Sequence, residues 1–106
     1  MTPLEYQRWC RRFDNHVDVG GPRPTSTALA LGLCAEAGEV ANEYERSRRQ
    51  GRDGHLDARK VGIELGDVLW NVARLADELG YTLEDLFEMN INKLLARYEE
   101  RGLEIK

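Results

Sequence analysis

Apolar residues recur at three- and four-residue spacing along most of the chain, which is the period of an amphipathic helix. The pattern predicts four helices, at about residues 3–16, 26–49, 58–79 and 83–101. No stretch shows the two-residue alternation of a half-buried strand. We therefore expect an all-α protein with a four-helix, bundle-like subunit.

The expected helix boundaries rest on capping residues. Thr2, Asp57 and Thr82 each precede a predicted helix and are good N-caps, and Thr25 or Ser26 is expected to cap the second helix. Pro3 fits the first position of the first helix. Glycines are expected to end the later helices: Gly51 with Gly54, then Gly80 in the C-cap position, then Gly102.

The third predicted helix has the broadest apolar face and is expected to be central. Its face comprises Val61, Leu65, Val68, Leu69, Val72, Leu75, Ala76 and Leu79. The second helix has a narrower stripe of Leu29, Leu33, Ala37, Val40 and Tyr44. The fourth presents Leu86, Phe87, Asn90, Ile91, Leu94, Leu95 and Tyr98. We expect Cys34 and Trp70, which lie within apolar runs, to be core residues.

Length and charge narrow the class of protein. The 106 residues are enough for one domain, spanning residues 1–106. A net charge of −4 disfavours a nucleic-acid-binding protein, which normally has a basic footprint. The start of the chain lacks the basic and apolar regions of a signal peptide, and no apolar run is long enough to span a membrane. We therefore expect a cytoplasmic protein.

The candidate chemistry lies in two acidic steps, each a pair of carboxylate residues three positions apart. Glu36 and Glu39 lie three residues apart in the second predicted helix, and Glu64 and Asp67 do so in the third. Residues i and i+3 share one face of a helix, so two antiparallel helices would bring four carboxylates together. Converging carboxylates repel and raise one another's pKa, and hard divalent cations relieve that repulsion. The pattern predicts an Mg²⁺ or Mn²⁺ site.

A single acidic step is common on solvated helix faces, but these two have unusual neighbours. Small and apolar residues surround both, and each contains a glycine, Gly38 or Gly66. A glycine inside a helix is about 1 kcal/mol less favourable than alanine, so close helix approach or room for a ligand is expected there. No histidine stands in either step, so the ligand set is all oxygen and favours Mg²⁺, Mn²⁺ or Ca²⁺ over zinc or iron.

Residues 31–98 resemble the MazG-like nucleotide pyrophosphohydrolases of the all-α NTP pyrophosphatase superfamily. The resemblance rests on three blocks: Glu36-Ala-Gly-Glu39-Val40, Glu64-Leu-Gly-Asp67-Val-Leu-Trp70, and Met89-Asn90-Ile-Asn-Lys93-Leu-Leu-Ala-Arg97-Tyr98. Some relatives carry a further Glu before each acidic pair, where this chain has Ala35 and Ile63. The number of bound ions therefore stays open.

The resemblance implies Mg²⁺-dependent hydrolysis of a (d)NTP to the (d)NMP and pyrophosphate, with Mn²⁺ as an alternative cation and a role in nucleotide-pool housekeeping. It implies that the four acidic residues hold the metal and that one of them, not assigned, activates water. Lys93 and Arg97 match basic positions expected to contact phosphates. Relatives build their sites at subunit contacts, so a homodimer or homotetramer is expected, with Lys93 and Arg97 acting in cis or across the interface.

Three further residues are candidates for substrate contact. Asn71 lies one turn after Asp67, Asn90 lies one turn before Lys93, and Trp9 offers a ring that could stack on a base; each also fits a purely structural role. The alternatives from other classes are a non-catalytic helical oligomer, acting as a nucleotide sensor or interaction module, and a hydrolase of another phosphorylated metabolite.

Overall fold

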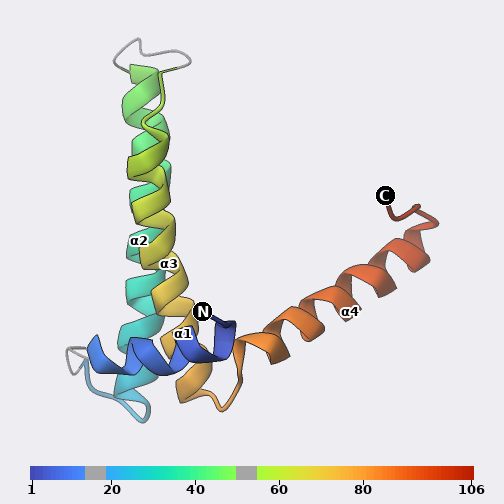
Figure 1. Ribbon diagram of the computed structural model, residues 1–106, viewed down its shortest axis with the longest axis horizontal. Coiled ribbons are helices and arrows are strands. Elements are labelled where there is room, and N and C mark those ends of the chain that lie inside the picture. The colour runs from blue at the N-terminus through green and yellow to red at the C-terminus, as the bar shows by residue number, and fades with distance from the viewer. Residues whose placement is uncertain (14–18, 50–54) are drawn as a thin grey trace.

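The computed structural model describes residues 1–13, 19–49 and 55–106, and every regular element in these ranges is helical (Figure 1). The elements are α1 (Pro3–Cys10), the 3₁₀ turn η1 (Arg11–Phe13), α2 (Pro24–Arg49), α3 (Ala58–Glu78) and α4 (Leu83–Arg101). The all-α, four-helix prediction is confirmed. No helix of these ranges is long and apolar enough to cross a membrane.

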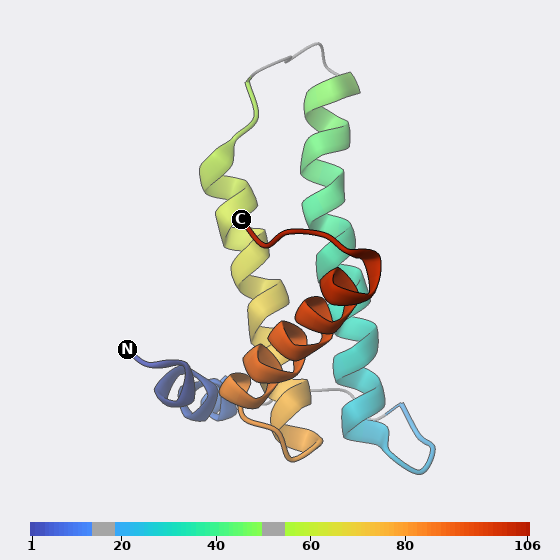
Figure 2. The same ribbon diagram turned by 90° about the vertical axis from the view of Figure 1, so that its right-hand side faces the viewer.

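The helices α2 and α3 form an antiparallel column on which the rest of the subunit is built. The helix α1 crosses one end of this column, and α4 leaves from the same end and points away from it (Figures 1 and 2). Only α3 contacts each of the other three α-helices closely, so its predicted central position is confirmed.

Three of the predicted N-caps are confirmed. The hydroxyl of Thr2 accepts from the backbone N–H of Glu5, and the Glu5 carboxylate accepts in return from Thr2 N–H. Thr82 and Asp85 form the same reciprocal box at the start of α4. The Asp57 carboxylate caps the first turn of α3. Each box satisfies backbone donors that a helix start leaves unpaired.

The predicted start of α2 is wrong, because it lies two to three residues too late. Thr25 and Ser26 lie inside the helix, which begins at Pro24, and the first backbone bond runs from Thr27 N–H to the carbonyl of Arg23. Proline suits the first helical position because it lacks only an N–H that would be unpaired there.

Two other ends differ in detail. The first α-helix ends at Cys10, and a 3₁₀ turn follows it. The C-cap of α3 is Leu79, and Gly80 follows with a φ of 83°, a left-handed conformation that glycine adopts without strain. The expected end of the first helix at His16, and the expected stops Gly51 and Gly54, lie outside the described residues.

The buried core is small and lies where α1, α3 and the start of α4 meet. Cys10, Ala73 and Leu83 form its centre, and Tyr6 and Trp70 pack against it. Trp70 is only partly buried, at the edge of this core. Burial raises the pKa of the Tyr6 phenol to about 12, aided by its hydrogen bond with Cys10, so the phenol is neutral.

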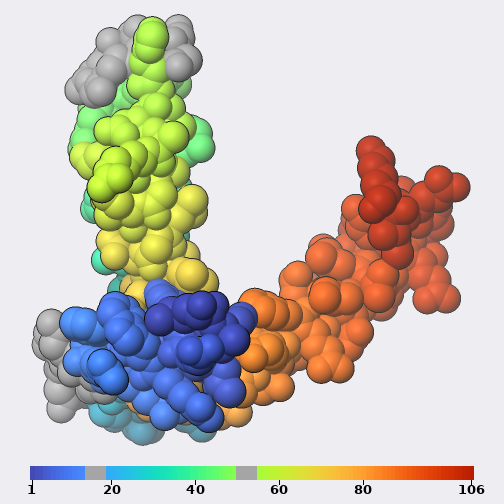
Figure 3. Space-filling view, viewed as in Figure 1, coloured from blue at the N-terminus to red at the C-terminus, as the bar shows by residue number. Residues whose placement is uncertain are grey.

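Much of the predicted apolar surface is uncovered within one chain. Cys34 is exposed, so its expected core position is wrong for the single subunit. On α2, α3 and the C-cap of α3, large apolar side chains left exposed include Leu31, Tyr44, Ile63, Leu65, Leu69 and Leu79. On α4 they are Phe87, Met89, Ile91, Leu94, Leu95 and Tyr98. The Cα radius of gyration is 17.0 Å, against about 13 Å for a compact domain of about this length, because α4 projects alone (Figure 3).

One buried amide ties the N-terminal helix to the turn between α3 and α4. The Gln7 side chain donates to the carbonyl oxygens of Ala73 (3.4 Å) and Tyr81 (2.8 Å) and accepts from Leu83 N–H (3.1 Å). Leu83 is the first residue of α4, so its N–H has no partner within the helix. The Gln7 amide therefore adds hydrogen bonds to the apolar packing that holds α1 against the start of α4.

Replacing Gln7 with leucine keeps the side-chain size but removes the partner of the buried Leu83 N–H and of the Tyr81 carbonyl. We expect Gln7→Leu to lower the free energy of unfolding by about 2–3 kcal/mol, measured by urea denaturation at fixed protein concentration. Arg8→Ala, an exposed position on the same helix, is the matched control and should change stability little. Equal stabilities of the two variants would show that the Gln7 amide does not hold α1.

Candidate metal centre

The facing residues of α2 and α3 define one antiparallel register. Three pairs mark it: Gly32 with Asn71, Glu36 with Asp67, and Glu43 with Lys60. From one pair to the next, the position on α2 advances by four and then by seven residues, and the position on α3 goes back by the same numbers. Four and seven residues are close to one and two helical turns, so all three pairs lie on the facing surfaces. The same register places Glu39 level with Glu64. Both predicted acidic steps therefore lie on the same stretch of the column.

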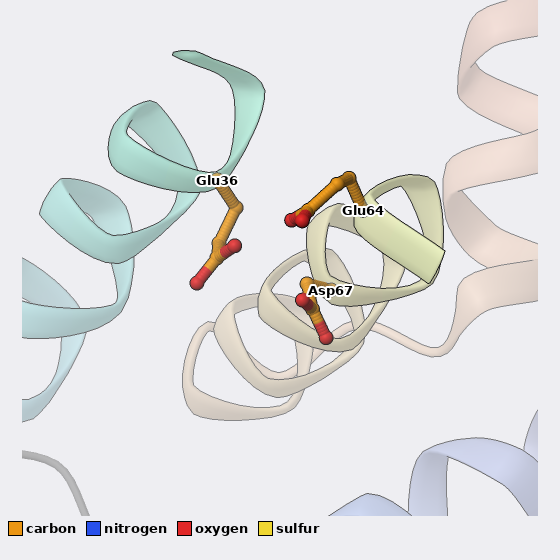
Figure 4. A group of neighbouring side chains, drawn as sticks. All are labelled: Glu36, Glu64 and Asp67. Atoms are coloured by element: carbon orange, nitrogen blue, oxygen red, sulfur yellow. The ribbon is translucent and has the colours of Figure 1, made fainter. Parts of the chain in front are cut away.

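Three of the four predicted carboxylates converge. Glu36 reaches from α2 toward Glu64 and Asp67 on α3 (Figure 4), and one oxygen of each lies within 4.8 Å of the others. Glu36 and Glu64 are half-buried, whereas Asp67 is exposed. Glu39 is exposed on α2 and does not belong to this group of ligand atoms. One cation could contact all three converging side chains.

The electrostatics of the cluster are those of an anion-rich site. Partial burial raises the pKa of Glu36 above its ordinary value, and the negative charges of Asp67, Glu64 and Glu39 raise it further. Within the described ranges, none of these carboxylates is in an ion pair with a lysine or arginine. By contrast, Glu43 further along α2 is paired with Arg46 and Lys60, both at 3.1 Å. The cluster therefore fits a divalent cation with oxygen ligands.

Asn71 lies behind the cluster, buried between the two helices. Its amide donates to the backbone carbonyl of Asp67 at 3.0 Å, and it lies against Gly32, where an added Cβ would come 2.7 Å from its Oδ1. Gly32 is therefore where α2 and α3 approach closely. A Cβ at Gly38 or Gly66 would meet nothing within 4 Å, so the expected close helix approach at these two glycines is wrong for the single chain.

Trp9 lies beside the cluster, which its position in the sequence did not reveal. It lines a hollow of about 350 Å³ with Phe13, Trp70 and Asp67. The sequence pattern assigned Phe13 no role at the site and placed Trp70 in the core. Its spacing shows only that Trp9 and Phe13, four residues apart, and Asp67 and Trp70, three apart, form two pairs of neighbours.

The predicted phosphate-binding residues are not at the cluster in this chain. Lys93, Arg97 and Asn90 are all exposed on α4, which points away from the α2–α3 column (Figures 1 and 2). The subunit therefore presents its acidic cluster and the candidate phosphate-binding residues Lys93 and Arg97 on separate parts.

The chain is an all-α protein in which three carboxylates from two antiparallel helices converge, a set of oxygen ligands that fits a divalent cation. The sequence model of the MazG nucleotide pyrophosphohydrolase domain matches residues 24–102. The chain belongs to this family.

Two relatives extend the comparison. The chain is 38% identical to the Gene 37 protein of Mycobacterium phage L5 over 78 residues, covering 71% of this chain and 67% of that protein. It is 36% identical over 107 residues to the uncharacterized protein YvdC of Bacillus subtilis (strain 168), covering 93% of this chain and 98% of the relative. No solved structure gives a significant match.

Removing one charge from the cluster tests two effects separately: the repulsion among the carboxylates without metal, and the stabilisation of the fold by an added cation. Because the pKa of Glu36 is raised, the folded protein holds that proton more tightly than the unfolded chain. Stability without metal should therefore fall as pH rises from the ordinary glutamate pKa through the raised one. Glu36→Gln should flatten this dependence and add about 0.5 kcal/mol at neutral pH in EDTA.

The same variant should lose stabilisation by added Mg²⁺ or Mn²⁺, because one ligand oxygen has lost its charge. Thermal melts with and without the cation measure both effects, and Glu84→Gln, on the exposed first turn of α4, is the control. A variant that is stabilised by cation as strongly as the wild type would remove Glu36 from the site.

Proposed function

We propose that this protein is an Mg²⁺-dependent nucleoside triphosphate pyrophosphohydrolase that converts a (d)NTP to the (d)NMP and pyrophosphate. The observation that carries the proposal is the convergence of Glu36, Glu64 and Asp67 within 4.8 Å, inside the segment matched by the family. Mn²⁺ is a second cation that oxygen ligands accept. The role that follows is removal of surplus or non-standard nucleotides in the cytoplasm.

The proposed reaction is an in-line displacement at phosphorus. The oxygen of a water molecule bonds to the α-phosphorus, and the bond from that phosphorus to the bridging oxygen breaks, so pyrophosphate leaves. A bound Mg²⁺ would supply positive charge to the phosphate oxygens and lower the pKa of a coordinated water. Glu36, Glu64 and Asp67 would hold the cation, together with Glu39, which lies one turn after Glu36 on α2. One of these four carboxylates, still unassigned, would accept the proton of the attacking water.

Pyrophosphate release from a panel of canonical and modified NTPs and dNTPs tests this proposal. The wild type should release pyrophosphate with Mg²⁺ and lose activity in EDTA. Glu39→Gln and Asp67→Asn should each lower kcat by at least about 100-fold, the scale of losing one group that stabilises charge in the transition state.

Circular dichroism of both variants controls for folding. A folded wild type that releases no pyrophosphate from any nucleotide would overturn the enzyme proposal. Calorimetric binding of Mg²⁺–nucleotide without turnover would then favour a nucleotide sensor. Phosphate release from other phosphorylated metabolites only would favour the second alternative.

We further propose that the active form is a homodimer or a pair of such dimers. Large apolar side chains are exposed along α4 and on α2 and α3, and exposed apolar surface that gathers in this way marks an interaction site. A second copy can cover the α4 face, and Lys93 and Arg97 on that helix then meet a carboxylate-rich surface of opposite charge. In this arrangement they neutralise the triphosphate and the leaving pyrophosphate across the interface.

Mixing two inactive variants distinguishes action in cis from action across the interface. One variant is Asp67→Asn and the other is Lys93→Ala with Arg97→Ala. After random subunit exchange about half of the dimers are mixed, and each mixed dimer has one intact site, so about a quarter of the wild-type activity should return. Light scattering checks that both variants keep the oligomeric state. No recovery after demonstrated exchange would contradict the proposal.

A further inference from the structure

Three aromatic side chains surround the hollow next to Asp67. Trp9 and Phe13 come from α1 and η1, and Trp70 comes from α3. Trp9 and Phe13 are 41% and 54% exposed, although both rings are large enough to gain substantially from burial. These rings therefore present open faces to a space of about 350 Å³.

The aromatic rings are held in place from the core outward. Tyr6 packs on the buried cluster of Cys10, Ala73 and Leu83. The Trp9 ring is stacked near Tyr6, with centroids 6.3 Å apart and planes 22° apart, and Phe13 tilts against Trp9 at 4.8 Å. The three rings of Tyr6, Trp9 and Phe13 are therefore supported at the Tyr6 end by the core. A ligand that binds Trp9 and Phe13 does not have to fix the position of every ring.

Asp67 connects the hollow to the cation site, because it lines the hollow and is also one of the three converging carboxylates. A ligand whose charged part is held at the carboxylates can therefore extend an uncharged part over the rings. The part of a nucleoside triphosphate that matches this surface is the flat, apolar face of the base.

Building on the proposed function, we propose that Trp9, Phe13 and Trp70 form the seat of the substrate's nucleobase. Among the described residues, those lining the hollow offer few groups that read base edges: the Asp67 carboxylate, which the proposed cation would also use, and the indole N–H groups. Stacking is tolerant of base identity because every base has a π-face. The seat therefore accepts several bases and favours purines, whose larger face covers more of the rings.

The test separates base binding from phosphate binding. Trp9→Ala should raise KM for a purine dNTP by roughly 5- to 150-fold, the range for losing one stacked aromatic ring, while kcat changes little. Trp9→Phe should restore most of the loss. The inhibition constant of inorganic tripolyphosphate, which has no base, should stay the same in all three proteins.

Tyr81→Ala, which removes an exposed aromatic ring in the turn between α3 and α4 that does not line the hollow, is the matched control and should leave KM unchanged. An unchanged KM in Trp9→Ala, or an equal loss of tripolyphosphate binding, would overturn the seat while leaving the hydrolase proposal intact. A wild type with no turnover of any nucleotide would instead overturn the hydrolase proposal.

In that case, calorimetry with a non-hydrolysable α,β-methylene purine nucleotide and Mg²⁺ tests the nucleobase seat without turnover. Trp9→Ala should weaken binding of this nucleotide by the same factor as expected for KM, and unchanged binding would overturn the seat.

Discussion

The close contact between α2 and α3 determines what this subunit can do. Gly32 allows the two backbones to approach at Asn71, and the ion pair of Glu43 with Lys60 joins the helices again, eleven residues further along α2. Between these points the helices are held in a register that forces acidic side chains to face one another. Like charges would favour separation, so packing on either side has to outweigh their repulsion. A bound cation would replace this repulsion with attraction between each carboxylate and the ion.

The sequence predicted the parts of the fold that depend on local chemistry. Capping boxes at Thr2 and Thr82 are satisfied by residues three positions away, so the helix starts follow from the sequence alone. The start of α2 was mistaken because Thr25 and Ser26 resemble caps, whereas Pro24 already fits the first helical turn. The facing carboxylates were predictable because helical period and an antiparallel turn are enough to bring them together.

The direction of α4 was not predictable from its apolar stripe. A stripe shows that a helix buries one face, but it does not say which surface covers that face or on which chain that surface lies. The same reason explains Cys34, which has the neighbours of a core residue and yet is exposed in the single subunit. The aromatic hollow was missed for a related reason. Trp9 and Asp67 are 58 positions apart, and only the docking of α1 on the column brings them together.

The Gln7 amide has a consequence for how motions can spread through the molecule. Its partners include Tyr81 and Leu83, where α4 begins, and it lies on α1 two residues before Trp9. A reorientation of α4 that displaced these backbone groups would pull the same amide and shift α1 with it. The hydrogen bonds of Gln7 therefore couple the direction of α4, whose apolar face is exposed, to the position of α1. Because α1 carries Trp9, a change in the direction of α4 would also move this ring relative to Asp67.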